Sequence, residues 1–295
     1  MVSYGATLAL IADGGWLVSG VSSKKAVKLF QMHVSTSIVL LVRIIPVLVV
    51  FAVMGFGQGI STATGIMAVV AGMFLTVGYY LFYYSLRMEH LSTTTIVNEL
   101  QPVVLVLLGT IVLGETVNGY SFVGMLMIFT GVAFVILNEG LSVNRKLLPA
   151  IIGSGSWATY WIIMTYLIQG SGSFAMPLFI SQLTCIVLML LYFVFFNRKL
   201  MHEVAAAFGS LSAGSRKALV AVGLSAMVGL GNGFADTVFS YVIQLRMVSI
   251  AGAVQALFPV IVLAFAFIAY KERLSKLQYI GTVVALAGAT ILTVF

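Results

Sequence analysis

Ten apolar segments, each about the length of a membrane helix, alternate with short polar stretches along the chain. They cover residues 3–21, 34–54, 63–86, 91–113, 119–138, 147–168, 174–196, 218–243, 248–270 and 276–294. A helix needs about 20 residues, most of them apolar, to cross the hydrocarbon core of a bilayer. Apolar residues occupy all sides of these segments, whereas the strands of a membrane barrel alternate between apolar and polar positions. The pattern therefore predicts an all-α integral membrane protein with ten transmembrane helices.

The composition excludes a water-soluble globule. Of the 295 residues, 61% are hydrophobic and 8% are charged, whereas soluble domains have roughly 25% charged residues. The one cysteine, Cys185, lies inside an apolar segment, and the three histidines lie in predicted loops without the paired spacing of metal ligands. We therefore expect no metal site, no cofactor and no disulfide framework. The chain begins without the basic region of a cleavable signal, so we expect the first apolar segment to remain as a membrane helix.

Lysine and arginine residues gather on one side of the predicted membrane. Thirteen of the fifteen lie in the odd-numbered loops, Arg246 lies on the opposite side, and Arg43 lies within a span. Because basic loops stay in the cytoplasm, both termini are predicted to be non-cytoplasmic in a multi-pass protein of the plasma or inner membrane. A net charge of +7 would suggest nucleic acid as the partner of a soluble protein. Here it orients the chain in the lipid bilayer, and we expect no nucleic-acid partner.

The two halves of the chain are related by an internal duplication. A single shift of the chain along itself superposes Ser92 on Ser249, Val97 on Val254, Leu100 on Leu257, Pro102 on Pro259, Glu115 on Glu272, Gly124 on Gly281 and Gly131 on Gly288. Nearer the start of each half, a smaller shift superposes Trp16 on Trp157. We therefore divide the chain into two five-helix repeats, residues 1–140 and 147–295. Since five is odd, the second repeat enters the membrane in the opposite direction, which predicts an inverted repeat around a central cavity.

The duplicated motifs also resemble those of a known family. The first copy reads Asn98-Glu-Leu-Gln-Pro-Val-Val, then Leu113-Gly-Glu115, and the second reads Gln255-Ala-Leu-Phe-Pro-Val-Ile, then Lys271-Glu272. As a doublet this order resembles the EamA-type branch of the drug/metabolite transporter superfamily over nearly the whole chain. The resemblance implies ten helices, a cavity lined mainly by helices 1, 3, 4, 6, 8 and 9, and secondary transport or export of small organic molecules.

Prolines interrupt the fourth and ninth predicted helices. Pro102 and Pro259 lack an N–H group, so the carbonyls of Asn98 and Gln255, four residues earlier, lose their helical partner. Both positions carry amide side chains, which makes them a candidate polar pair for substrate binding. The prolines are candidate hinges. The alternative is a pair of kinks whose free carbonyls are satisfied by neighbouring helices.

Three carboxyl groups lie inside predicted spans, on Asp13, Glu99 and Asp236. A charge at the membrane centre costs about 2.5–3.5 kcal/mol on insertion scales, so such residues are functional candidates. A carboxyl group buried away from water holds its proton more firmly, which suits proton or substrate coupling. We rank Glu99 first, because it adjoins the proline break and has no acidic counterpart in the second half. The alternative for each is a pair with Arg43 or a hydrogen bond to a tyrosine.

The remaining charged candidates are expected to be structural. Arg43 is predicted to reach the cytoplasmic interface or to pair with one of the carboxylates. Glu115 and Glu272 follow the fourth and ninth helices and are expected to cap the adjoining hairpins. The glycine faces of the fifth and tenth helices predict close helix packing and leave both a monomer and a homodimer open.

Aromatic residues recur at helical spacing in three of the spans. The candidates for a cage around an ammonium group, by cation–π attraction, are Trp16, Tyr80, Tyr83, Trp157 and Trp161. Asn232 shares a helical face with Asp236 and joins the candidate binding residues. The alternative for most of these rings is ordinary packing between helices.

Together these features predict a secondary active transporter that works by alternating access. We expect a proton-coupled exporter or exchanger of small metabolites such as amino acids or amines, because three carboxyl groups and one basic residue lie within the spans. A drug or organic-cation efflux carrier of the same fold is the alternative. A channel is less favoured, because channels usually need subunit symmetry or a charged pore. An intramembrane enzyme is disfavoured too, because the spans lack a nucleophile with a base or a metal cluster.

Overall fold

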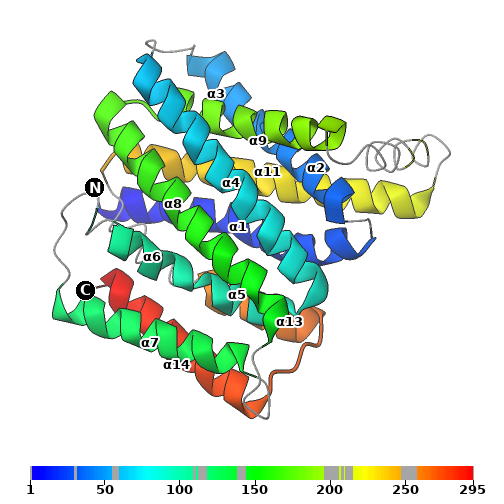
Figure 1. The fold of residues 1–295 in the computed structure, drawn as a ribbon, viewed down its shortest axis with the longest axis vertical. Helices are drawn as coiled ribbons and strands as arrows, with labels where there is room; N and C mark the ends of the chain where they lie inside the picture. Colours follow the sequence, from blue (N-terminus) through cyan, green and yellow to red (C-terminus); the bar gives the residue numbers. More distant parts are fainter. Residues whose placement is uncertain are drawn as a thin grey trace. The chain divides into compact units, whose positions relative to one another are not determined.

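The fold is all-helical in the part of the chain that the structure, a computed structural model, describes (Figure 1). The described residues are 2–29, 32–54, 60–108, 111, 118–137, 144–195, 206, 209, 215–246 and 258–294. The helices are α1 (Val2–Leu29), α2 (Met32–Arg43), α3 (Ile45–Met54), α4 (Thr62–Met88), α5 (Leu91–Asn98), α6 (Leu100–Leu108), α7 (Gly119–Ile136), the 3-10 turn η2 (Arg145–Leu147), α8 (Leu148–Ser171), α9 (Ala175–Phe195), α11 (Arg216–Gln244), α13 (Phe258–Ala269) and α14 (Lys276–Val294).

Five helical stretches in the described residues are long and apolar enough to cross a membrane. They are Met32–Val53, Thr62–Met88, Arg145–Ser171, Ala175–Tyr192 and Arg216–Gln244. Shorter apolar helices cover Phe122–Ile136 and Lys276–Ile291. Each of these helices overlaps an apolar segment that the sequence predicts, whereas α1 continues beyond its predicted end to Leu29. The protein is therefore a multi-pass helical membrane protein.

Prolines divide two of the predicted spans into two helices each. The fourth span breaks at Glu99, where the backbone N–H donates to the carbonyl of Ile96 at 3.0 Å. The break lies at the position expected from Pro102, whose ring excludes a continuous helix through the carbonyl of Asn98. The second span breaks at Ile44, between α2 and α3. This break was not predicted, although Pro46 is the same kind of signal.

The chain forms two compact units, and each takes segments from both halves of the sequence. Unit 1 comprises Met1–Leu10, Val77–Ile163 and Arg246–Phe295, and unit 2 comprises Ile11–Thr76 and Met164–Leu245. The compact units therefore do not coincide with the two sequence halves. Each unit combines both sequence halves because helices of one half pack against helices of the other.

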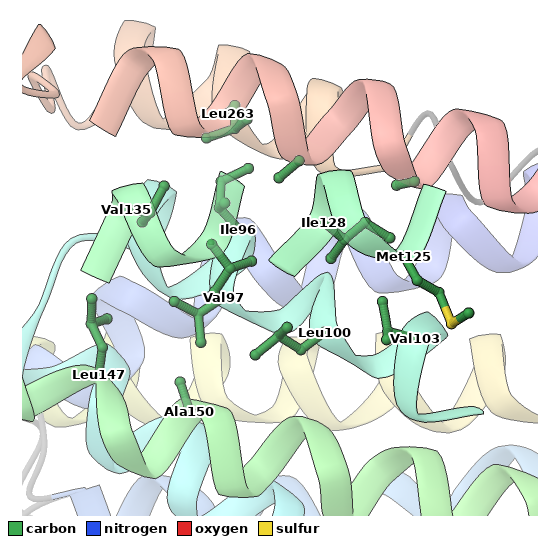
Figure 2. Packing of buried hydrophobic residues seen from close by; sticks show 13 residues of the cluster. Ile96, Val97, Leu100, Val103, Met125, Ile128, Val135, Leu147, Ala150 and Leu263 are labelled. Atoms are coloured by element: carbon green, nitrogen blue, oxygen red, sulfur yellow. The ribbon is translucent and has the colours of Figure 1, made fainter. Parts of the chain in front are cut away.

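Unit 1 is built around an apolar cluster where α5, α6, α7 and α8 meet α13 and α14 (Figure 2). Its buried residues include Ile96, Val97, Val103, Ile128 and Leu263. The side chains come from both halves of the sequence, so burial of this cluster holds the halves together.

Helices α7 and α14 lie side by side within unit 1 (Figure 1), and they pack closely through glycines. A Cβ atom placed on Gly281 would lie 2.5 Å from the carbonyl oxygen of Gly131, and one on Gly288 would lie 2.7 Å from that of Gly124. The first glycine of each helix thus faces the second glycine of the other, so the helices run in opposite directions. These glycine faces cover one another inside the chain and are not free to form a dimer contact.

In unit 2, α11 packs against α1 and α2 through alternate glycines. Gly231 lies against Gly15 of α1, where a Cβ atom would be 2.6 Å from the carbonyl oxygen of Gly15. A Cβ atom on Gly229 would lie 2.7 Å from the carbonyl oxygen of Val39 in α2, and one on Gly233 would overlap the carbonyl of Arg43. Without side chains at these positions, the backbones of three helices approach closely enough for short polar side chains to meet.

Candidate functional site

A buried polar network joins α1, α2 and α11 in unit 2. The guanidinium group of Arg43, through Nη2, pairs with Oδ2 of Asp236. The indole N–H of Trp16 donates to Oδ1 of the same carboxylate at 3.1 Å. The side chains of Arg43 and Asp236 are 1% and 3% exposed. Both carboxylate oxygens therefore have partners, and this arrangement favours a structural role for Asp236, the alternative kept open for it by the sequence.

Asp13 lies one turn before Trp16 on α1 and differs from Asp236 in its surroundings. Its side chain is buried, and its Oδ1 atom has no hydrogen-bond partner among the described residues. Asn232 lies one turn before Asp236 on α11 and is also buried. A buried carboxyl oxygen without a partner is costly, and in this respect Asp13 differs from Asp236, whose two carboxylate oxygens both have partners.

Glu99 occupies the break between α5 and α6 in unit 1. It is buried, with 8% of its surface exposed, and its carboxyl group makes no hydrogen bond or ion pair within the described residues. The adjoining Asn98 accepts a hydrogen bond through Oδ1 from the hydroxyl of Ser154 on α8 at 3.0 Å. The break thus places an unpaired carboxyl group beside an amide that is fixed to a neighbouring helix.

Ser154 was not among the predicted site residues. Its hydroxyl also lies 2.8 Å from the carbonyl of Ala150 and 3.4 Å from that of Val97. The signal in the sequence is the repeat itself, because the shift that places Trp157 on Trp16 also places Ser154 on Asp13. The two equivalent positions therefore carry a hydroxyl in unit 1 and a carboxyl group in unit 2.

Four aromatic rings of α4 and α8 pack on one another in unit 1. Trp157 lies 5.0 Å from Tyr79 and 5.1 Å from Phe82 between ring centroids, and Tyr83 lies 5.7 Å from each of these two. Gly78 lies against the pyrrole part of the indole, where a Cβ atom would be 2.6 Å from Nε1. These rings cover one another and do not form an open cage. This is the packing alternative considered for them.

The other predicted aromatic residues of unit 1 lie outside this group of four rings. Trp161 is buried and packs against Tyr160 with the ring centroids 4.8 Å apart. Tyr80 is half-buried on α4. The contact of Trp161 with another ring is again the packing alternative, and a role of Tyr80 and Trp161 in binding a cation stays a prediction.

Glu272 caps the N-terminus of α5 from the loop between α13 and α14. Its Oε1 accepts from the backbone N–H of Leu91 at 2.8 Å, and its Oε2 accepts from the N–H and hydroxyl of Ser92 at 2.9 and 2.8 Å. His90 Nδ1 lies 3.7 Å from Oε1. The carboxylate satisfies N–H groups that the first turn of a helix leaves without partners, and it does so between the two sequence halves.

The candidate residues are divided between the two units, apart from those outside the described residues. Gln255 and Glu115 lie outside the described residues, and Pro259 lies in the first described turn of α13. Unit 2 holds Asp13, Trp16, Arg43, Asn232 and Asp236, whereas unit 1 holds Tyr80, Tyr83, Asn98, Glu99, Pro102, Trp157, Trp161, Pro259 and Glu272. Within the described residues, no group of three or more His, Cys, Asp or Glu side chains could hold a metal ion.

Long apolar helices with carboxyl and amide groups buried among them define a polytopic membrane protein with intramembrane polar sites. The model of the EamA-like transporter family matches residues 3–137 and again residues 145–294. The chain therefore belongs to the EamA-like transporter family, which is part of the drug/metabolite transporter superfamily.

The chain also shares its fold with a solved structure. A solved structure titled "Crystal structure of protein" is 14% identical, covers 97% of this chain and 95% of its own, and has a TM-score of 0.60. It shows a shared fold. No curated protein matches the chain.

Proposed function

We propose that this protein is a proton-coupled secondary transporter that exports or exchanges small metabolites with an amino group, such as amino acids or amines. The observation that carries the proposal is Glu99, a buried carboxyl group without a hydrogen-bond partner in the described residues, at a helix break inside a span. A transporter family provides the class, and the buried carboxyl group provides a site that exchanges a proton for a cationic group.

Asp13 is proposed as the second coupling residue. Its Oδ1 is buried without a partner in the described chain, whereas Asp236 is neutralised by Arg43. The intramembrane charge that remains available to a substrate is therefore acidic, and this supports a cationic or zwitterionic substrate over an anionic one. The break beside Pro102 is proposed as the hinge at which the site changes its access.

The proposed inverted repeat is supported by contacts that occur twice. Gly72 of α4 lies against Ser181 and Thr184 of α9, and Gly229 of α11 lies against Val39 and Val42 of α2. The shift that places Pro102 on Pro259 also places Gly72 on Gly229. Val39 and Val42 have the same spacing as Ser181 and Thr184, and they lie on the corresponding helix of the other repeat. Equivalent glycines thus meet corresponding helices, as expected for an inverted repeat that supports alternating access.

Transport by purified protein in proteoliposomes tests the proposal. With labelled amino acids and amines inside or outside and an imposed pH gradient, we expect saturable flux that shows counterflow and responds to the gradient. Glu99→Gln should abolish the response to the gradient, and Asp13→Asn should reduce it. Glu89→Gln, a change in the loop before α5, is the matched control. Flux that ignores the pH gradient, or variants with unchanged coupling, would contradict the proposal.

A further inference from the structure

Glu272 fixes the two halves of the chain to each other at the start of α5. Its carboxylate accepts from the backbone N–H groups of Leu91 and Ser92 at 2.8 and 2.9 Å and from the hydroxyl of Ser92 at 2.8 Å. Leu91 and Ser92 are fully buried, and Glu272 is 8% exposed. All three residues lie in unit 1. We call this contact the latch.

The backbone before Glu272 is held in an uncommon conformation. Lys271 has a φ of 53°, in the left-handed region that residues other than glycine rarely adopt. This turn follows the end of α13, and the N–H of Glu272 donates back to the carbonyl of Ala266 at 3.3 Å. Lys271 and Arg273 are exposed, whereas Glu272 between them is buried. The turn therefore directs the carboxylate inward and leaves the flanking basic residues at the surface.

Helix α5 has the latch at one end and the helix break at the other. It consists of eight residues, which corresponds to about 12 Å of α-helix. The break at Glu99 separates it from α6 in the same span. Between its ends, Ile96 and Val97 pack in the apolar cluster with Leu263 of α13 (Figure 2). Apolar contacts are non-directional, whereas the hydrogen bonds of Glu272 hold α5 at one position along α13.

The latch is stable when it is fully closed or fully open to water. In the closed latch, the carboxylate and the N–H groups of the first helical turn satisfy one another. A slightly opened latch would leave both kinds of group buried without partners, which is costly. Water is close at hand, because the side chain of His90, whose Nδ1 lies 3.7 Å from Oε1 of Glu272, is 56% exposed. We therefore expect the latch to open as a unit.

We propose that Glu272 is a positioning residue that controls the access of Glu99 through α5. The closed latch holds the fourth and ninth spans together on the side of the membrane where the basic loops lie. When the latch opens, α5 turns about the break beside Pro102, and the carboxyl group at the break changes its access. The inference rests on the alternating access of the proposed function and not on the substrate class proposed there.

The accessibility of a cysteine one turn beyond the latch tests this inference without a substrate. Thr95 is buried on α5, and Thr95→Cys places a thiol there. Membrane vesicles of each orientation are treated with a membrane-impermeant sulfonated maleimide, and labelling is measured above that of the native Cys185, which is buried. Glu272→Gln should raise the labelling rate about tenfold, which is the effect of one hydrogen bond to a charged group. The increase should occur with the maleimide on the side of the basic loops.

Glu89→Gln is the matched control in the adjoining turn. Its partner Lys146 is 57% exposed, and exposed ion pairs contribute little, so labelling should stay within about twofold of the Thr95→Cys protein. Ser92→Ala is the second variant and serves if Glu272→Gln does not fold. It removes one of the three hydrogen bonds of the latch and should raise labelling in the same direction by a smaller factor.

Pro102→Ala distinguishes control of access from simple capping of α5. The alanine restores a backbone N–H group and favours a continuous helix through the break. If α5 turns about the break, Pro102→Ala should suppress the increase in labelling that Glu272→Gln causes. If Glu272 only holds the first turn of α5, the increase should persist, because fraying of that turn does not depend on Pro102.

The outcomes separate this inference from the proposed function. Unchanged labelling in Glu272→Gln and Ser92→Ala overturns the inference, and so does an increase that Pro102→Ala leaves in place. Neither result depends on transport of an amino compound. If labelling follows the expected pattern and the proteoliposomes transport no amino acid or amine, the proposed substrate class is wrong and the role of Glu272 stands.

Discussion

Gly233 of α11 lies directly against the backbone carbonyl of Arg43 at the end of α2. Asp236 follows Gly233 by one turn, and its carboxylate pairs with the guanidinium group of Arg43. The close approach of the two backbones allows a short aspartate side chain to reach a residue 193 positions away in the sequence. The glycine contact and the ion pair therefore depend on each other, and each can be tested by substitution.

Gly233→Ala should destabilise the protein. A Cβ atom at this position overlaps the carbonyl of Arg43, and overpacking in a well-packed interior costs about 1–3 kcal/mol. Gly223→Ala on the same helix is the control, because no atom lies within 4 Å of a Cβ atom there. Thermal unfolding in detergent, followed by circular dichroism, should show a lower midpoint for Gly233→Ala only. Equal midpoints for the two variants would show that the α2–α11 contact is not close in the membrane protein.

Asp236→Asn should be more harmful than the double replacement of Arg43 and Asp236. The single change leaves the guanidinium group buried without its counter-charge, at a cost of about 3–5 kcal/mol. Arg43→Met with Asp236→Leu removes both charges, and the double variant should recover most of that loss. A double-mutant cycle on the unfolding free energy measures the coupling. Additive losses would mean that the two side chains do not interact.

Glu272→Gln should weaken the start of α5. The carboxylate accepts three hydrogen bonds from Leu91 and Ser92, and loss of a good N-terminal cap costs about 0.5–2 kcal/mol. Hydrogen exchange of the first turn of α5 should increase, while exchange in α11 should be unchanged. Glu89→Gln is the control, since its partner Lys146 is 57% exposed and exposed ion pairs contribute little. Unchanged exchange in α5 would contradict the capping role.

Gly131→Val and Gly288→Val should destabilise the protein to a similar extent. The two glycines occupy equivalent positions in the repeat, and each faces a glycine of the other helix. A valine would separate α7 from α14 and expose the apolar cluster that they cover. Gly119→Val, at the first residue of α7, has open space around it and is the control. Unfolding midpoints measured side by side decide the question, and a large difference between the first two variants would argue against equivalent packing.

The helical segments, the break beside Pro102 and the duplication can all be predicted from the sequence. The first two follow from local physical chemistry. A stretch that is apolar on all sides forms a helix in lipid, because the helix satisfies its backbone hydrogen bonds within the segment, and a proline in the helix interior removes one such bond. Pro46 is the same kind of signal for the break between α2 and α3. The repeat is visible because equivalent positions keep the same rare residues, such as Pro102 and Pro259.

Which polar groups pair with one another was decided only by the tertiary structure. Asp13 and Asp236 look alike in the sequence, yet only Asp236 meets Arg43 and Trp16, whereas one oxygen of Asp13 has no partner in the described chain. The same is true of the two indoles, of which one has a carboxylate beside it and the other does not. Helical periodicity determines which residues share a face, but the neighbour of that face depends on how distant helices pack, and small residues such as Gly233 determine how closely they do so.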